Sequence, residues 1–261
     1  MGRKWGMSRL AQGIELSGKV AIVTGGTRGL GRGIALGLAW AGCSVAVCGR
    51  NEPDNLPPGL TFHQADIRDP DQARGFVDAV AGAHGRIDIL VNNAGGSPAV
   101  RAEEASPRFA EAILKLNLLA PLQMAQAAHR HMAAARSGSI VNISSVSGIR
   151  PSPGTAIYGA AKAGLLNLTQ SLAQEWGPVG IRVNAIVAGL MVTETAAQTY
   201  GDAEAQAAVG ASMPLGRMGT GDDLAGAVLW LCSPLAEWVS GARINVDGGG
   251  ERPFFLDLVK E

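Results

Sequence analysis

Residues 19–40 read KVAIVTGGTRGLGRGIALGLAW, a short apolar run followed by a glycine-rich turn and then by a longer segment with helical periodicity. The first six residues are rich in β-branched side chains, which predicts a buried strand. From Gly31 to Trp40 the apolar residues recur at the spacing of a helix face. Residues 44–48 (SVAVC) then repeat the strand pattern. Together these segments predict a β-α-β unit in which the glycine-rich turn opens the helix.

Segments of the same two kinds alternate along the rest of the chain. Apolar runs predict strands at residues 61–65, 87–92, 139–144, 182–187 and 242–246, and helical spacing predicts helices at 71–84, 106–136, 158–176 and 222–231. Strands that are apolar throughout are typical of a parallel sheet covered by helices on both faces. We therefore expect an α/β fold: a single doubly wound domain, residues 16–261, with a sheet of about seven strands after an N-terminal extension of residues 1–15.

Residues 189–219 form the least regular part of the chain. The stretch is rich in Ala, Thr and Gly and lacks strand character, although it lies between two predicted strands. A long connection of this kind is typical of a lid or substrate loop. The alternative is a surface insertion with no role.

Composition excludes several classes of function. Lys+Arg and Asp+Glu number 22 each, so the net charge is zero, which argues against a protein that binds nucleic acid or anionic lipid by charge. The three cysteines, Cys43, Cys48 and Cys232, form no C-x-x-C pair, which indicates free thiols in a reducing compartment. Because the N-terminus lacks an apolar run typical of a secretory signal, we expect a cytoplasmic protein. No metal is expected, since the histidines form no ligand pattern: His63, His84, His129 and His131.

The turn after the first predicted strand reads Thr24-Gly25-Gly26-Thr27-Arg28-Gly29-Leu30-Gly31. Its glycines permit a tight turn and the close approach of the backbone to a pyrophosphate, and the helix N-terminus offers free N–H groups and the positive end of a dipole. The spacing is G-x-x-x-G-x-G, which differs from the G-x-G-x-x-G pattern of many dinucleotide-binding turns. The turn therefore predicts a phosphate site.

Four motifs in this order resemble those of the short-chain dehydrogenase/reductase family. They are the turn from Thr24 to Gly31, the segment Asn92-Asn93-Ala94-Gly95, Ser145 followed thirteen positions later by Tyr158, and Tyr158-x-x-x-Lys162. The resemblance covers nearly the whole chain, from about residue 16 to residue 250. It implies a Rossmann fold and a hydride transfer between a nicotinamide cofactor and a carbonyl or alcohol group.

The resemblance also assigns catalytic roles. An isolated Tyr-x-x-x-Lys pair is more often two surface side chains on an amphipathic helix, but the other three motifs favour a catalytic pair. Tyr158 would be the general acid/base, and Lys162, four residues on and on the same helix face, would hold the nicotinamide ribose and lower the tyrosine pKa. Ser145 would donate a hydrogen bond to the reacting carbonyl. Asn117 matches the asparagine that anchors a water in the proton relay.

The same resemblance implies a cofactor site that runs along several predicted strand ends. Asp66 matches a residue that contacts adenine, Asn93 to Gly95 would line the adenine ribose, and Thr193 would bind the carboxamide. The chain has Val187-Ala188-Gly189-Leu190 where relatives usually have Pro-Gly, which leaves the backbone there less restricted. The expected cofactor-binding residues are Gly25, Thr27, Arg28, Gly29, Leu30, Gly31, Arg50, Asn51, Asp66, Ile67, Asn93, Ala94, Gly95, Tyr158, Lys162, Gly189, Leu190 and Thr193.

The end of the second predicted strand indicates which cofactor is preferred. Relatives that prefer NAD carry an aspartate there, whose carboxylate accepts hydrogen bonds from the ribose 2′-OH and repels a 2′-phosphate. This chain has Gly49, followed by Arg50, and Arg28 lies in the glycine-rich turn. Two guanidinium groups suit a phosphate dianion. We therefore predict NADP(H) in preference to NAD(H).

The expected function is that of an NADP(H)-dependent reductase or dehydrogenase of a ketone or secondary alcohol. A 3-oxoacyl thioester reductase is one alternative, which basic residues such as Arg101 or Arg217 near the pocket mouth would favour, and a reductase of a bulkier cyclic ketone is another. A non-catalytic NADP(H) sensor is a third. Surplus leucines on the predicted helices around residues 114–122 and 165–172 favour a homodimer or homotetramer. The aromatic pair Phe254-Phe255 would cap the substrate pocket, form a subunit contact or pack into the core.

Overall fold

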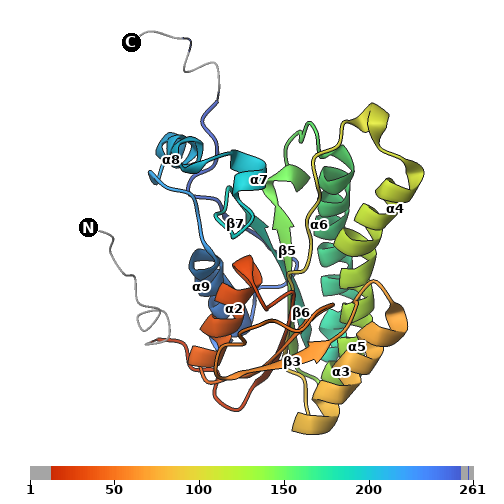
Figure 1. Ribbon diagram of the computed structural model, residues 1–261. Coiled ribbons are helices and arrows are strands. Elements are labelled where there is room, and N and C mark those ends of the chain that lie inside the picture. The colour runs from red at the N-terminus through yellow and green to blue at the C-terminus, as the bar shows by residue number, and fades with distance from the viewer. Residues whose placement is uncertain (1–12, 254–257, 259–261) are drawn as a thin grey trace.

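The computed structural model describes residues 13–253 and residue 258. Within them the chain forms one seven-stranded parallel sheet of order β3-β2-β1-β4-β5-β6-β7, with helices on both faces (Figure 1). This confirms the predicted α/β class and the doubly wound sheet. Residues 1–12 of the predicted extension and the Phe254-Phe255 pair lie outside the described residues.

The predicted strands are all present. The strands are β1 (Val20–Thr24), β2 (Ser44–Gly49), β3 (Leu60–Gln64), β4 (Ile89–Asn92), β5 (Gly138–Ser145), β6 (Ile181–Ala188) and β7 (Arg243–Val246). The α-helices are α2 (Gly29–Trp40), α3 (Pro70–His84), α4 (Pro107–Leu114), α5 (Ala120–Ala135), α6 (Ala156–Trp176), α7 (Ala197–Tyr200), α8 (Ala203–Ser212) and α9 (Gly221–Cys232). None of the described helices combines the length and the apolar character needed to cross a membrane.

Two apolar clusters hold the helices on the sheet. Val20 and Ile22 of β1 pack in the cluster of α3, α5 and α6, whereas Ala21 and Val23 pack in the cluster of α2 and α9. Figure 1 shows these two helix layers on opposite sides of the sheet. Because side chains alternate between the faces of a strand, a strand buried on both faces must be apolar at every position. This explains why β1 has no polar face.

Glycines let α2 and α9 approach closely. A Cβ on Gly33 would lie 2.6 Å from the carbonyl carbon of Gly221, and a Cβ on Gly37 would lie 2.8 Å from the Cβ of Ala225. Both distances are shorter than real Cβ contacts. The small residues on α2 are therefore a packing requirement, and they fix how the helix that opens at the glycine-rich turn sits on the sheet.

The carboxyl ends of the strands lie at one edge of the sheet, and the order reverses between β1 and β4. In a doubly wound sheet, such a reversal opens a crevice between the loops that leave the two strands. The glycine-rich turn leaves β1 there, and residues 93–96 leave β4. Further along, Ser145, Ala188 and Val246 lie side by side at the ends of β5, β6 and β7.

Two elements differ from the prediction. The helical stretch predicted at about 106–136 is present, but it contains a π-helical turn, Lys115–Leu119, between α4 and α5 that was not predicted. The side chain of Asn117 donates from Nδ2 to the Ile113 carbonyl at 3.0 Å, and it therefore competes with the backbone for that acceptor.

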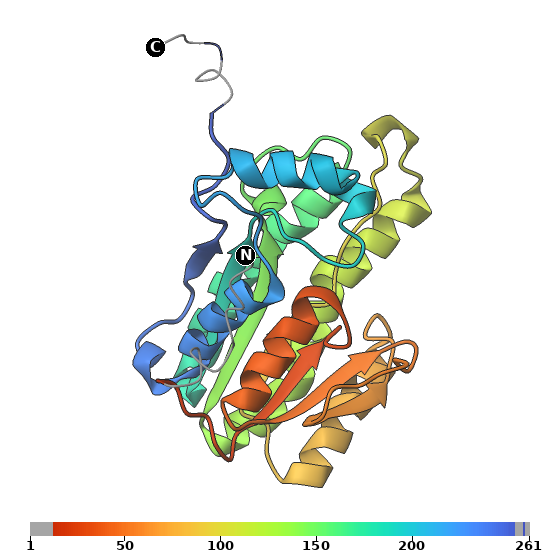
Figure 2. The same cartoon turned by 60° about the vertical axis from the view of Figure 1, so that its left-hand side comes forward.

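The segment 189–219 is also more regular than its sequence indicates. It contains α7 and α8, which lie across the top of the sheet in Figure 2. The Asp202 side chain caps α8 by accepting from the Ala205 N–H at 2.9 Å. The helix escaped prediction because its alanine-rich sequence has no apolar stripe, and Gly210 is its one buried residue.

Candidate active site

Thr24 and Asn93 join the glycine-rich turn to the loop after β4. The Thr24 hydroxyl oxygen accepts from the N–H groups of Asn93 and Ala94, both at 3.0 Å. Asn93 Nδ2 donates to the carbonyls of Thr24, at 2.9 Å, and Gly25, at 3.3 Å. The Thr24 and Asn93 side chains therefore join the glycine-rich turn to the Asn92-Asn93-Ala94-Gly95 segment, each by hydrogen bonds to main-chain groups of the other segment.

The turn has the geometry of a cradle for a phosphate group. Gly25 and Gly29 have φ values of +64° and +55°, which favour glycine. A Cβ on Gly31 would lie 2.3 Å from the Gly25 carbonyl oxygen. Because Arg28 at the N-cap gives no side-chain cap to α2, the N–H groups at this helix end suit an anion such as the pyrophosphate of a dinucleotide.

A carboxylate from the segment after β6 reaches this helix end. The Gly29 N–H donates to Glu194 Oε1 at 3.1 Å, across 165 positions of sequence. This hydrogen bond, with the positive charges of Arg28 and Arg32, lowers the pKa of Glu194 although partial burial opposes it. Residue 194 was not among the predicted site residues, because no local pattern relates it to the turn.

Ser145, Tyr158 and Lys162 lie together above the carboxyl edge. Ser145 ends β5, and the short turn that follows packs on α6, where a Cβ on Gly148 would lie 2.8 Å from the Lys162 carbonyl carbon. The Ser145 hydroxyl oxygen accepts from the Ser147 N–H at 3.1 Å. Lys162 is 3% exposed, and its Nζ donates to the Ile143 carbonyl at 2.8 Å and lies 5.6 Å from the centre of the Tyr158 ring. The structure thus brings the predicted catalytic side chains together.

Burial dominates the pKa values of the pair. It raises the pKa of Tyr158, which a hydrogen bond with Ser145 lowers in part and the nearby Tyr200 raises further. Burial lowers the pKa of Lys162 to about 8. Burial, Ser145 and Tyr200 account for the shift in the Tyr158 pKa, and the expected lowering of that pKa by Lys162 stays a prediction. The Lys162 amine is turned towards the Ile143 carbonyl, to which it donates a hydrogen bond.

Asn117 supports the loop after β4. It is fully buried in the π-helical turn, where its Oδ1 accepts from the Gly96 N–H at 2.9 Å and its Nδ2 donates to the Gly96 carbonyl at 3.0 Å. A Cβ on Gly95 would lie 2.7 Å from Asn117 Oδ1 and 3.1 Å from Lys162 Nζ. The side chain therefore holds the loop directly beside the lysine.

The residues expected around the adenosine lie at the ends of β2 and β3. Asp66 accepts two hydrogen bonds from Arg68 Nε and one from Nη2, and these hydrogen bonds lower the pKa of Asp66, with Arg50 adding a smaller charge effect. Arg28 and Arg50 are exposed, one near Glu194 and the other near Asp66. Ile67 is buried, and Asn51 is exposed.

The residues expected at the nicotinamide end lie after β6. Gly189 packs so closely on the chain that a Cβ there would lie 2.6 Å from the Asp247 Cα. The Leu190 carbonyl accepts from the Gly219 N–H at 2.9 Å, so the two ends of the predicted substrate loop are tied together. The Thr193 hydroxyl lies 3.3 Å from that of Thr195.

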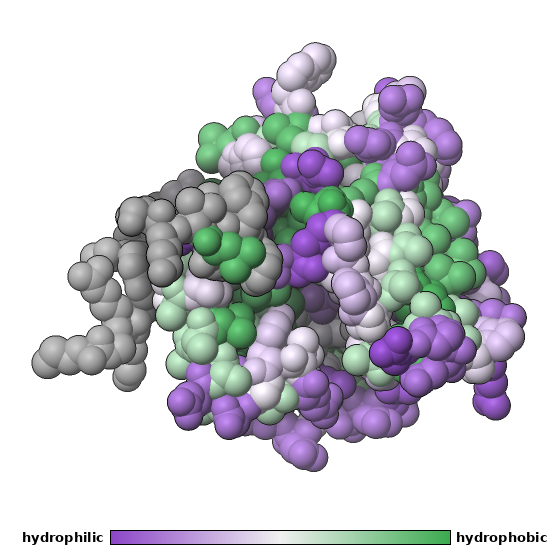
Figure 3. Space-filling model, turned by 90° about the horizontal axis from the view of Figure 1, so that it is seen from above, coloured by the Kyte–Doolittle hydropathy of each residue, from purple (hydrophilic) through white to green (hydrophobic). Residues whose placement is uncertain are grey.

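The two arginines expected at the pocket mouth have partners of their own. Arg101 Nε donates to Glu103 at 2.6 Å, and Arg217 makes two hydrogen bonds to Asp223 at 2.8 and 2.7 Å. Figure 3 looks down on this side of the molecule, where both hydrophilic and hydrophobic residues surround a central hollow. An ion pair that sequence analysis missed, Arg150 with Glu251, lies at this edge.

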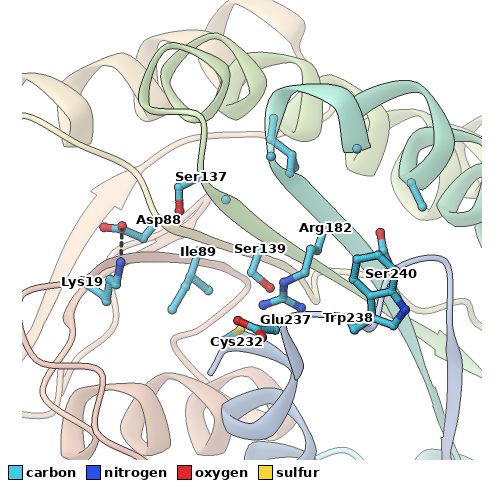
Figure 4. Close-up of a pocket in the computed structure, with 15 residues that line it drawn as sticks. Lys19, Asp88, Ile89, Ser137, Ser139, Arg182, Cys232, Glu237, Trp238 and Ser240 are labelled. Carbon is cyan, nitrogen blue, oxygen red and sulfur yellow. Dashed lines mark hydrogen bonds and ion pairs between the residues drawn. The ribbon is translucent and has the colours of Figure 1, made fainter. Parts of the chain in front are cut away.

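A second cavity lies at the opposite, amino edge of the sheet. It has a volume of about 540 Å³ and is lined by residues from the starts of β1, β4, β5 and β6, with Arg182 and Trp238 at one end (Figure 4). None of the predicted catalytic or cofactor-binding residues lines it. The carboxyl edge, where the motifs converge, is therefore the candidate active site.

Comparison with known proteins gives relatives of one kind. A family model described as enoyl-(acyl carrier protein) reductase matches residues 25–251. The 2-dehydro-3-deoxy-D-gluconate 5-dehydrogenase of Escherichia coli (strain K12) is 37% identical over 243 residues, which cover 90% of this chain and 96% of that protein. The 3-oxoacyl-(acyl-carrier-protein) reductase of Chlamydia muridarum is 36% identical over 244 residues, which cover 90% of this chain and 98% of that protein.

Solved structures agree with these relatives. A crystal structure from Beutenbergia cavernae, described as an NAD(P)-dependent gluconate 5-dehydrogenase with bound NADP, is 34% identical, covers 90% of this chain and 97% of its own, and has a TM-score of 0.82. The aldohexose dehydrogenase of Thermoplasma acidophilum is 30% identical over 91% of this chain and 96% of its own, with a TM-score of 0.86. Motifs, fold and relatives agree, and the chain belongs to the short-chain dehydrogenase/reductase family of oxidoreductases.

Proposed function

We propose that this chain transfers a hydride between NADP(H) and a ketone or secondary alcohol, with Tyr158 as the general acid/base. The observation that carries the proposal is the grouping of Ser145, Tyr158 and Lys162 beside the glycine-lined turn. The turn, Arg28 and Arg50 would hold the phosphates, and Asn93 to Gly95 with Thr193 would line the riboses and the nicotinamide. Bound there, the cofactor supplies or accepts the hydride.

The side chains of the site suit a proton transfer to a carbonyl oxygen. The Ser145 oxygen accepts from the Ser147 N–H, and the hydroxyl also hydrogen-bonds with Tyr158. When substrate binds, its hydrogen would turn to the substrate carbonyl. Burial raises the pKa of Tyr158, which favours the protonated hydroxyl that donates as the alcohol forms. The Lys162 ammonium lies close enough to stabilise the phenolate that results. Asn117 keeps the loop after β4 beside that lysine.

A kinetic experiment tests the proposal. Oxidation of NADPH is followed by its absorbance against a panel of ketones and 3-oxoacyl thioesters, with NADH in parallel. We expect turnover that is faster with NADPH and that falls about 10²–10⁴-fold in Tyr158→Phe, because the general acid is lost. NADPH binding and thermal stability should be unchanged in this variant. An active Tyr158→Phe enzyme would exclude the tyrosine from the proton transfer.

A 3-oxoacyl thioester reductase is the second candidate, favoured by the relative from Chlamydia muridarum with that name. It predicts that thioesters are preferred over simple ketones in the panel. Arg101 and Arg217 give it no support, since each is paired with a neighbouring carboxylate. A protein that binds NADPH and turns over no member of the panel would favour the sensor instead.

We further propose a homodimer or homotetramer in the cytoplasm. Leu119, next to α5, is 46% exposed, which suits a subunit contact along these helices. The three cysteines are free, as in a reducing compartment. The division into an extension, residues 1–15, and a catalytic domain, residues 16–261, with a substrate loop at 189–219 remains part of the proposal. A monomeric mass by light scattering would exclude the oligomer.

A further inference from the structure

Arg150 lies on the segment that carries the catalytic side chains. It follows Ser145 by five residues and precedes Tyr158 by eight. Its N–H donates to the Val146 carbonyl at 3.0 Å, which folds the chain back next to Ser145. The side chain is 37% exposed. A guanidinium group is thus placed at the carboxyl edge by the same turn that places the catalytic serine.

The partner of Arg150 comes from the other side of the site. Glu251 follows β7, and the last residues of β5, β6 and β7 are neighbours in the sheet, so Ser145 and Val246 lie about 10 Å apart at about 4.8 Å per strand. The chain after β7 turns back, with the Gly250 N–H donating to the Asp247 carbonyl at 3.1 Å. Arg150 Nη2 then donates to Glu251 Oε1 at 2.9 Å, and Arg150 Nε pairs with Oε2.

Tyr200 links this ion pair to the catalytic tyrosine. It ends α7, which lies over the sheet, and it is the only tyrosine in the chain besides Tyr158. Burial raises the pKa of Tyr200, and the charges of Glu251 and Arg150 act on it as well. Tyr200 in turn raises the pKa of Tyr158. The charges of Arg150 and Glu251 thus act on Tyr200, and Tyr200 acts on Tyr158.

The Arg150–Glu251 ion pair is weak enough for another carboxylate to take the place of Glu251. Both side chains are more than a third exposed, at 37% and 41%, and ion pairs with this exposure add little to stability. An arginine takes a carboxylate in a planar, two-pronged arrangement, which Glu251 already demonstrates. By contrast, Asp223, the partner of Arg217, also belongs to the capping box of α9 and is tied to that helix.

We propose that the substrate is a hydroxy or oxo acid whose carboxylate binds Arg150 in place of Glu251, while its carbonyl or alcohol carbon lies between Ser145 and Tyr158. The proposal rests on the proposed function. In the reducing direction, NADPH bound there would supply the hydride for the new C–H bond as the C=O π bond breaks. The Tyr158 hydroxyl gives its proton to the oxygen and regains one from solvent. NADP⁺ and a hydroxy acid result.

Two substrates that differ only in the charge of the carboxylate test whether Arg150 binds that group. The probes are 5-oxohexanoate and its methyl ester, tested with NADPH on the full chain. We expect kcat/KM to favour the acid. Arg150→Gln should lower kcat/KM for the acid about 10–100-fold, mostly through KM, and leave the ester within about twofold, since a charge-assisted pair is lost. Arg150→Lys should restore part of the loss, and Glu251→Gln should raise kcat/KM for the acid alone.

Arg243→Gln, which removes an exposed arginine at the start of β7, is the matched control and should leave both substrates unaffected. Binding gives a readout without turnover: 5-oxohexanoate is titrated by calorimetry into the protein with NADP⁺, where no hydride is available. We expect this binding to weaken in Arg150→Gln. Equal losses for acid and ester, or a preference for the ester, would overturn the carboxylate proposal and leave the oxidoreductase proposal intact. If 5-oxohexanoate binding depends on Arg150 but no probe is turned over, the oxidoreductase proposal would be overturned and the carboxylate site would stand.

Discussion

The prediction of NADP(H) rests in part on Gly49, at the end of β2, and the structure has room for a side chain at this position. A Cβ at this position would meet nothing nearer than the Asn51 carbonyl oxygen at 3.5 Å, which is ordinary contact. We therefore expect Gly49→Asp to fold normally and to shift the ratio of kcat/KM for NADPH and NADH about 10–100-fold towards NADH. The new carboxylate accepts from a ribose 2′-OH and repels a 2′-phosphate. Steady-state kinetics with both cofactors measures the ratio. Gly49→Asn, similar in size and neutral, is the control, and an equal shift in both variants would contradict the charge argument.

Single residues were predictable where their partners lie nearby in sequence. The Tyr158-x-x-x-Lys162 spacing places both side chains on one helix face, and the structure brings them within 5.6 Å, from the lysine Nζ to the ring centre. Glu194 and Glu251 were not predicted. Their partners lie 165 and 101 positions away, and no local period connects residues that meet only through the order of strands in the sheet.

At the scale of elements, the segment after β6 is attached to the start of α2 by Glu194. The carboxylate lies where the helix N-terminus would bind the pyrophosphate, and Arg28 and Arg32 add positive charge. Glu194→Gln keeps an oxygen that can accept from Gly29 and removes the negative charge. We expect it to bind NADPH about two- to fivefold more tightly, since a charge at a helix end is worth about 0.3–1 kcal/mol. Fluorescence titration of NADPH measures the affinity.

Glu204→Gln is the matched control for this prediction. It makes the same change of charge on α8, where the side chain is exposed, and it should leave the affinity unchanged. Weaker binding in Glu194→Gln alone would mean that the carboxylate secures the bound cofactor rather than competing with it.

The elements themselves were predictable where apolar periodicity is strong. The π-helical turn was not, because it depends on one buried side chain, Asn117, taking a carbonyl from its own helix.

At the scale of the molecule, the strand pattern predicted the sheet because each strand is buried on both faces and therefore apolar throughout. The two edges of the sheet differ in how far the sequence predicts them. Glycines and polar motifs mark the carboxyl edge, whereas the cavity at the amino edge has no motif and was not predicted. The amino edge contains Asp88, a buried carboxylate that accepts hydrogen bonds from Lys19, Val20 and Arg86. We expect its charge to stabilise the fold.

Asp88 makes the fold sensitive to acid. It is 6% exposed and accepts from the Val20 N–H at 2.9 Å, from Arg86 at 2.7 and 2.6 Å and from Lys19 at 3.2 Å. Burial alone would raise the pKa of Asp88, but the hydrogen bonds from Arg86, Val20 and Lys19 outweigh it and lower the pKa. A carboxyl with a lowered pKa contributes stability that is complete above its unfolded pKa of about 3.9 and is lost as the pH falls through the lower folded value.

We therefore expect Asp88→Asn to lower the free energy of unfolding by about 1–3 kcal/mol at neutral pH, because the buried Val20 N–H and both cations lose a charged acceptor. The difference from the unsubstituted chain should shrink as the pH falls below about 4, since acid protonates Asp88 there. Urea unfolding at a series of pH values measures both curves. Asp71→Asn, whose side chain is 89% exposed, should stay within about 0.5 kcal/mol at neutral pH. Curves for Asp88→Asn and the unsubstituted chain that remain parallel down to the most acid pH would show that the charge of Asp88 does not contribute, and that the loss at neutral pH comes from replacing an acceptor oxygen by an NH2 donor.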